Sequence, residues 1–331
     1  MLDQRVGENN FTISVVAPLY NEEKNVAPFL ERLKQVFEEI GCDWEVVFAL
    51  DPSPDRTEDV VREFIQKGFP IRLIKFSRRI GKPLSLMAGL KESDGDATVI
   101  IDVDLQDPPE LISDMVRKWR EGYRVVLAQR SSRSGENVCY LLAARLFYWL
   151  ASKLGEYPVP KNTGDFRLLD RRVVQALREC NERHAFLRGL TAAVGFDAAV
   201  IPFCRDKRHS GRTNISVRGA LNIALDGLIP FSRAPVRMLF LIGASLCMLG
   251  LIGMAAWLGG SYWRGLSGHW PLIVMLFLQL IIGGIAIAGL GVLGEYIVRT
   301  YEEVRRRPLY VVDSRVESTV LVQRRQQRVS S

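Results

Sequence analysis

The sequence has few of the residues that build zinc sites and disulfide frameworks. It contains three histidines in 331 residues, and its five cysteines are scattered without a Cys-x-x-Cys pair. A zinc site is not expected, because none of the histidines has a second ligand close by in the sequence. The cysteine pattern instead predicts reduced structural thiols in a domain that faces the cytosol.

Two common nucleotide-binding loops are missing as well. No Gly-x-Gly-x-x-Gly follows the first predicted strand, and no Gly-Lys-Ser/Thr loop occurs anywhere, which argues against dinucleotide-binding and P-loop proteins. Residues 1–10 lack the basic and apolar regions of a secretory signal, so the first domain is expected to stay in the compartment where it is made. The net charge of +7 indicates an anionic partner, and nucleic acid, anionic lipid and a phosphorylated substrate all fit it.

Short β-rich runs alternate with longer amphipathic segments through the first part of the chain. The predicted strands are Ile13–Ala17, Glu45–Leu50, Ile71–Phe76, Thr98–Asp102 and Arg124–Gln129. Between the first two, Glu22–Ile40 repeats apolar residues at the spacing of a helix with one buried face. Alternating strands and helices predict an α/β domain with a mostly parallel sheet and right-handed crossovers.

An apolar run ends abruptly in two acids, Asp102 and Asp104. Residues at i and i+2 share a face of a strand, and ligands of open α/β sheets bind at the carboxyl ends of strands. Two carboxylates there can hold a divalent cation that clamps a nucleotide diphosphate. A chance pair of surface acids is the alternative, and the preceding strand argues against it.

Two long apolar segments predict a membrane hairpin in the second half of the chain. Residues 238–258 and 272–293 contain no charged side chain, and each is long enough to cross the roughly 30 Å hydrocarbon layer. Arginines lie before the first segment and after the second, so the positive-inside rule places both termini in the cytoplasm. The glycines of both segments permit close helix approach, either within the hairpin or between subunits of a homo-oligomer.

The predicted organisation therefore has four parts. Residues 1–214 form a cytoplasmic catalytic domain, 215–235 a juxtamembrane helix region, 236–298 two transmembrane helices, and 299–331 a basic cytoplasmic tail. The juxtamembrane region has a narrow polar stripe, which fits a helix in the lipid interface or a helix packed on the domain itself.

Several ordered segments resemble one known enzyme family. They are Val16-Ala17-Pro18-Leu19-Tyr20-Asn21-Glu22-Glu23, Asp51-Pro52-Ser53-Pro54-Asp55-Arg56-Thr57, Asp102-Val103-Asp104-Leu105-Gln106-Asp107-Pro108-Pro109-Glu110, Gly164-Asp165-Phe166-Arg167-Leu168 and Leu293-Gly294-Glu295-Tyr296-Ile297-Val298-Arg299. The chain resembles the inverting, GT-A fold glycosyltransferases of family 2 that load a polyisoprenyl phosphate, in particular the membrane-anchored bacterial glucosyltransferase type. Dolichol-phosphate mannose synthase is a relative in that group.

The resemblance implies a donor site and a metal site. Pro18, Tyr20, Glu22 and Asp51 would bind the base and ribose of a UDP-sugar. Asp102, Asp104 and Gln106 would serve the diphosphate and a Mg²⁺ or Mn²⁺ ion, to which oxygen ligands are suited. One departure concerns the base, because the family usually has two acids and a glycine where this chain has Leu50-Asp51-Pro52.

The acceptor would be undecaprenyl phosphate or another polyisoprenyl phosphate, with no nucleic-acid partner. Arg130, Arg133, Arg205 and Arg208 would bind its phosphate, because the arginine fork matches phosphate oxygens, and solvated surface charge is the alternative for each. The motif after the second basic cluster departs from the family, with Asn214 and Ile215 replacing its usual lysine and aromatic residue.

The resemblance places Asp165 nearest the attacking oxygen. It would be a general base, or it would orient the sugar or Arg167, because a phosphate monoester is already mostly dianionic at neutral pH. Asp104 is the second residue expected to be catalytic.

The expected activity is transfer of a hexose, glucose in the first instance, from UDP to the lipid phosphate with inversion, at the cytoplasmic face of the membrane. The alternatives are another donor, such as GDP-mannose or a UDP-aminopentose, and a membrane-tethered nucleotide-binding module without catalysis. A processive polysaccharide synthase would need more membrane spans and a Gln-x-x-Arg-Trp motif, which this sequence lacks.

Overall fold

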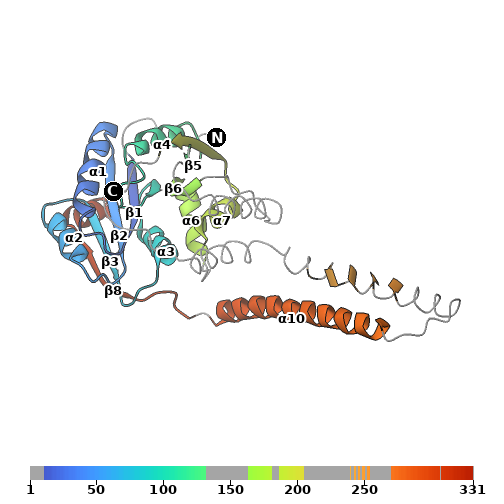
Figure 1. The fold of residues 1–331 in the computed structure, drawn as a ribbon. Helices are drawn as coiled ribbons and strands as arrows, with labels where there is room; N and C mark the ends of the chain where they lie inside the picture. Colours follow the sequence, from blue (N-terminus) through green and yellow to red (C-terminus); the bar gives the residue numbers. More distant parts are fainter. Residues whose placement is uncertain are drawn as a thin grey trace.

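The computed structural model describes residues 11–131, 163–180, 186–204, 270–305 and 307–330, together with scattered positions between 239 and 253. Most of these residues form an α/β body, from which one long helix extends (Figure 1). The strands are β1 (Thr12–Leu19), β2 (Asp43–Leu50), β3 (Ile71–Phe76), β4 (Ala97–Ile100), β5 (Val125–Arg130), β6 (Thr163–Asp170), β7 (Ala198–Phe203) and β8 (Val312–Glu317). The helices are α1 (Val26–Ile40), α2 (Thr57–Gln66), α3 (Lys82–Glu92), α4 (Leu111–Arg120), α6 (Arg171–Glu179), α7 (Leu187–Ala193), α10 (Trp270–Val304) and α11 (Thr319–Ser330).

The strands form one eight-stranded mixed sheet in the order β7-β5-β6-β4-β1-β2-β3-β8. The central pairs β4-β1, β1-β2 and β2-β3 are parallel, as is β5-β7, whereas β6 and β8 run antiparallel to their neighbours. The predicted α/β class and mostly parallel sheet are confirmed, and so are all five predicted strands. Strand β4 ends earlier than predicted, so Asp102 lies in the loop beyond it.

Two apolar clusters cover the two faces of the sheet. One contains the buried side chains of α1, α2 and α4, and the other contains those of α3, α6 and α7. Helix α1 buries Phe29, Leu30, Leu33 and Phe37, the stripe that its sequence predicted. The central strands alternate between these clusters and are buried on both faces, which explains their continuous Val and Ile runs.

The chain order reverses at β1, which has β2 on one side and β4 on the other. Such a switch point leaves a crevice outside the carboxyl ends of the adjacent strands. The loops after β1, β2 and β4 therefore meet at one edge of the sheet.

The sequence predicts a basic tail for residues 299–331, but part of this segment belongs to the eight-stranded sheet. Strand β8 pairs with β3 in register from Arg72↔Glu317 to Lys75↔Ser314, with a bulge before Phe76↔Val312. Buried Arg72 holds Glu317 at 2.8 Å and Glu45 at 3.5 Å, so charge pairing accompanies the strand pairing. The physical reason for the difference is long-range pairing, which local composition does not reveal.

One helix among the described residues is long and apolar enough to cross a membrane. Its apolar part is Ile281–Val304 within α10, which has a mean hydropathy of 2.0 and is not buried against any other part of the described chain. The predicted second span, 272–293, lies inside α10, which continues past it to Val304. The predicted first span falls mostly outside the described residues, although those described between 239 and 253 are helical. The two-helix hairpin is thus not confirmed, and the juxtamembrane region 215–235 also lies outside the described residues.

Candidate active site

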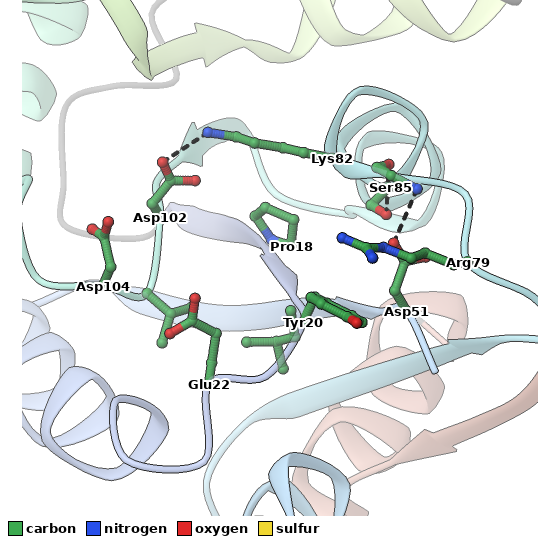
Figure 2. Close-up of a pocket in the computed structure, with 12 residues that line it drawn as sticks. Pro18, Tyr20, Glu22, Asp51, Arg79, Lys82, Ser85, Asp102 and Asp104 are labelled. Atoms are coloured by element: carbon green, nitrogen blue, oxygen red, sulfur yellow. Dashed lines mark hydrogen bonds and ion pairs between the residues drawn. The ribbon is translucent and has the colours of Figure 1, made fainter. Parts of the chain in front are cut away.

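A cavity of about 260 Å³ opens at the carboxyl ends of β1, β2 and β4. The predicted donor and metal residues that line it are Pro18, Tyr20, Glu22, Asp51, Asp102 and Asp104. Figure 2 shows Asp102 and Asp104 on one side of the cavity and Tyr20, Arg79 and Asp51 on the other. The structure therefore brings together acids and an aromatic ring that are far apart in the sequence.

Lys82 joins the two acidic motifs at the acidic side of the cavity. Its Nζ donates to Asp102 Oδ2 at 2.7 Å and lies 2.9 Å from Asp165 Oδ2. Burial alone would lower the pKa of Lys82, but the two carboxylates raise it above its ordinary value. A fixed positive charge thus lies between two carboxylates, one from the loop after β4 and one from β6.

Asp165 is held by three positive charges. Besides Lys82, Arg188 Nε of α7 donates to its Oδ1 at 3.0 Å. Burial would raise the pKa of Asp165, but the charges of Lys82, Arg188 and Arg167 outweigh burial and hold this pKa well below its usual range. Asp165 is accordingly ionised in the pH range around the second pKa of a phosphate monoester, about 6.

Arg167 supports the strand around Asp165 from inside the protein. Its guanidinium is buried and donates to the carbonyl oxygens of Gly164 and Asp165 and to Thr191 Oγ1. Burial lowers the pKa of Arg167 to about 10. Because these donors go to backbone and to Thr191, Arg167 fixes the Gly164-Asp165 peptide rather than facing the cavity.

Asp104 sits in a strained loop beyond β4. Its side chain is 5% exposed, and its Oδ1 accepts a hydrogen bond from the Gln106 backbone N–H at 3.1 Å. Leu105 between them has φ 59°, a left-handed conformation that costs a non-glycine residue roughly 1–3 kcal/mol. Such strain persists only where the surroundings hold it, here through the buried Leu105 side chain. Gln106 is not among the residues that line the cavity.

Asp51 holds the loop between β3 and α3 in place. Its two carboxylate oxygens accept hydrogen bonds from the backbone N–H groups of Ile80 and Gly81, at 3.0 and 2.9 Å. Gly81 has φ 84° and is the N-cap residue of α3, which begins with Lys82. A side chain at this position would be strained, so glycine suits the sharp turn that aims Lys82 into the cavity.

The opposite side of the cavity offers an aromatic surface and a cation. The Arg79 guanidinium lies over the Tyr20 ring at 3.8 Å from its centroid. The Glu22 side chain makes a contact close by in the chain, because its Oε2 accepts a hydrogen bond from Asn25 Nδ2 at 2.5 Å, just before α1. Because Arg79 covers this face of the Tyr20 ring, a ligand in the cavity would meet a stacked ring and guanidinium here.

Arg130 is the one predicted acceptor-binding arginine that the structure describes. It lies at the end of β5, with its Nη2 3.8 Å from Asp107 Oδ1. A Cβ added to Gly164 would be 3.3 Å from the same nitrogen, so Arg130 lies against the backbone just before Asp165. Arg133, Arg205 and Arg208 lie outside the described residues.

Sequence reasoning missed Lys82, Arg79 and Arg188. The first two follow β3 in Arg78-Arg79-Ile80-Gly81-Lys82, and the strand-end argument that found Asp102 could have found them. Arg188 had no such signal, because its contact with Asp165 depends on how α7 packs against β6.

The sequence matches the profile of glycosyl transferase family 2 over residues 14–178. A relative from Synechocystis sp., an uncharacterised glycosyltransferase, is 38% identical over 91% of this chain and 94% of its own length. A prophage bactoprenol glucosyl transferase homolog of Escherichia coli is 35% identical over 91% of this chain and 98% of its own length. Among solved structures, mannosyl-3-phosphoglycerate synthase from Rubrobacter xylanophilus is similar with a TM-score of 0.47 and 20% identity, covering 71% of this chain and 75% of that one.

The family model and the relatives define the class of this protein, which is a glycosyltransferase, as predicted. The chain belongs to glycosyl transferase family 2, as both the profile and its relatives show.

Proposed function

We propose that this glycosyltransferase moves glucose from UDP-glucose to undecaprenyl phosphate, with inversion at the anomeric carbon. The observation that carries the proposal is the convergence of Asp102 and Asp165 on Lys82, which lines the cavity of about 260 Å³. The bactoprenol glucosyl transferase names of relatives that align over nearly their whole length support the choice of sugar and acceptor.

The two sides of the cavity fit the two ends of a nucleotide diphosphate. The base and ribose would lie beside the stacked Tyr20 and Arg79 side chains, and the diphosphate would lie toward Lys82, Asp102 and Asp104. When the diphosphate binds, Lys82 would pair with it in addition to Asp102 and Asp165. This cation would help to neutralise the charge on UDP as it leaves.

A divalent cation fits the acidic side of the cavity. No group of three or more His, Cys, Asp or Glu side chains in the described residues could hold a metal by itself. Mg²⁺ does not need three protein ligands, because it is usually bound by one or two carboxylates together with substrate phosphates and waters. Asp102 and Asp104 would hold it, whereas Gln106, the third predicted ligand, does not line the cavity. When bound, Mg²⁺ or Mn²⁺ would neutralise charge on the leaving diphosphate.

Chelation is therefore expected to abolish transfer. Treating washed membranes with EDTA should remove transfer from UDP-glucose to the lipid phosphate, and adding Mg²⁺ or Mn²⁺ in excess should restore it. Calcium-saturated EDTA is the control for chelator toxicity. Full activity in free EDTA would rule out the metal role of Asp102 and Asp104.

The chemical step is a single displacement. An oxygen of the acceptor phosphate attacks the anomeric carbon, the new carbon–oxygen bond forms as the bond to UDP breaks, and UDP leaves with the electron pair. Arg130 would hold the acceptor phosphate beside Gly164 and Asp165, and we propose Arg133, Arg205 and Arg208 as further phosphate ligands. Asp165 would orient the sugar hydroxyls and keep Lys82 and Arg188 in place.

A panel of donors tests the proposal directly. Membranes from cells that overexpress the chain should transfer labelled glucose from UDP-glucose to C55 polyprenyl phosphate, and Asp165→Asn membranes serve as the matched control. If sugar were transferred from GDP-mannose or a UDP-aminopentose and not from UDP-glucose, the proposed donor would be wrong but the proposed reaction would stand. If the chain bound the nucleotide but transferred no sugar, it would instead be a membrane-tethered nucleotide-binding module.

The proposed setting is the cytoplasmic membrane, with both chain termini in the cytoplasm. In a cysteine-free background, a cysteine at Ser267 should react with an impermeant maleimide added to intact cells. For the C-terminal side, Val322 is 41% exposed and suits a cytoplasmic reporter, whereas Ser318 is only 1% exposed. A cysteine at Val322 should react only after the cells are opened, and the opposite pattern would reverse the orientation.

A further inference from the structure

The loop Ser77–Lys82, called here the basic loop, supplies three residues to the cavity. They are Arg79, Gly81 and Lys82. Asp51 fixes the inner side of the loop through the N–H groups of Ile80 and Gly81. The outer side of the basic loop needs support as well, because its conformation sets where Lys82 points.

The segment Leu309–Val312, called here the return segment, gives that support. Ser77 N–H donates to the carbonyl oxygen of Val311 at 3.0 Å. Arg78 Nη2 donates to the carbonyl oxygen of Leu309 at 3.4 Å. The ring of Tyr310 packs edge-on against Phe76, the last residue of β3, with centroids 5.4 Å apart. Three consecutive residues thus contact the return segment: Phe76 at the end of β3, and Ser77 and Arg78 at the start of the basic loop.

A shared apolar cluster joins the two segments a second time. Tyr310 and Val312 pack against the cluster on one face of the sheet, and Ile80 and Leu84 pack against the same cluster. Leu84 belongs to the first turn of α3, two residues after Lys82. Movement of the return segment would therefore be transmitted to both ends of the turn that carries Lys82.

The return segment also lies close in sequence to the end of α10 at Val304. Only a few residues separate them, so the position of the apolar helix limits where Leu309 can lie. Figure 1 shows the chain passing from α10 back to β8 beside β3.

From these contacts we infer that the return segment is a positioning element for the donor site, which links the end of the apolar helix to Arg79 and Lys82 through the basic loop. The inference rests on the proposed function for its ligand, a nucleoside diphosphate. Tyr310 is the positioning residue to test, because its ring packs on Phe76, the last residue of the strand that precedes the loop.

Tyr310→Ala in the full-length protein should raise the dissociation constant for UDP with Mg²⁺ about fivefold to tenfold, the loss expected for one or two supporting contacts. Its KM for UDP-glucose should rise in proportion, whereas the KM for polyprenyl phosphate should not change. Tyr310→Phe keeps the ring and should bind UDP like the wild type.

Arg324→Ala is the matched control in the same C-terminal region. Arg324 binds Asp43 Oδ1 at 2.8 Å and the carbonyl oxygen of Trp44, at the far end of β2 from the cavity. If docking of the whole C-terminal region were all that mattered, Arg324→Ala would weaken UDP binding as much as Tyr310→Ala, and the inference would be overturned. We expect its UDP affinity to stay at the wild-type value.

Hydrogen exchange separates this inference from the proposed function. Without ligand, amide exchange in residues 77–82 should be faster in Tyr310→Ala than in the wild type, and unchanged in Arg324→Ala. Unaltered exchange in Tyr310→Ala would overturn the positioning role whatever the ligand is. Faster exchange in a protein that fails to bind UDP would keep the positioning role and refute the proposed donor.

Discussion

Asp104→Asn is expected to lower turnover by about a hundredfold or more, because removal of one preorganised charge at a transition state has an effect of that size. The side chain is nearly buried, lies on the acidic side of the cavity and is held by the N–H of Gln106. Asparagine keeps the shape and one acceptor oxygen but removes the negative charge that would hold a cation. The rate of glucose transfer at saturating donor and acceptor measures the effect.

Asp114→Asn is the control for this change. Asp114 is an exposed residue of α4 that pairs with Arg117 at 2.9 Å on the helix surface, where such pairs contribute little. We expect wild-type turnover from it. If Asp104→Asn also turned over like the wild type, neither a metal nor a diphosphate would depend on that carboxylate.

Asp165→Asn should lose most turnover while it still binds UDP, and the deficit should be the same from about pH 5.5 to about pH 8. The family resemblance left two roles open for Asp165, and the loss of a general base would matter more below the second phosphate pKa of about 6. The structure argues against the general base, because Lys82, Arg188 and Arg167 overcome the effect of burial and hold the pKa of Asp165 well below its usual range. A carboxylate with so low a pKa is a poor proton acceptor.

The measurement is the ratio of wild-type to Asp165→Asn turnover across that pH range, with UDP affinity recorded alongside. A flat ratio together with a raised donor KM supports the orienting role. A ratio that grows steadily toward low pH would restore the general base, and a ratio near one would remove Asp165 from the mechanism.

The cavity was predictable where strand ends alone decide which residues meet. Tyr20, Asp51 and Asp102 follow three parallel strands that the sequence pattern identified, and parallel neighbours bring their carboxyl ends to one edge. The same logic extends to Lys82, which was missed because a basic stretch after a strand is typical of solvated surface.

Asp165 was found only through resemblance to a family. Its place depends on β6, which enters between β4 and β5 in the antiparallel direction, and local sequence does not state which neighbours a strand will choose. Strand β8 was missed for the same reason, since its partner β3 is more than two hundred residues earlier in the chain. Arg188 and the left-handed Leu105 are likewise products of packing rather than of pattern.

The position of β8 after α10 also sets an order of assembly during synthesis. While the ribosome is still making the apolar helix, β3 is an unpaired sheet edge, which is a site for wrong pairing and aggregation. The edge is covered only after β8 has emerged, and because β8 follows α10 in the chain, α10 emerges from the ribosome first. The catalytic sheet of a nascent chain is therefore complete only after its hydrophobic helix has been synthesised.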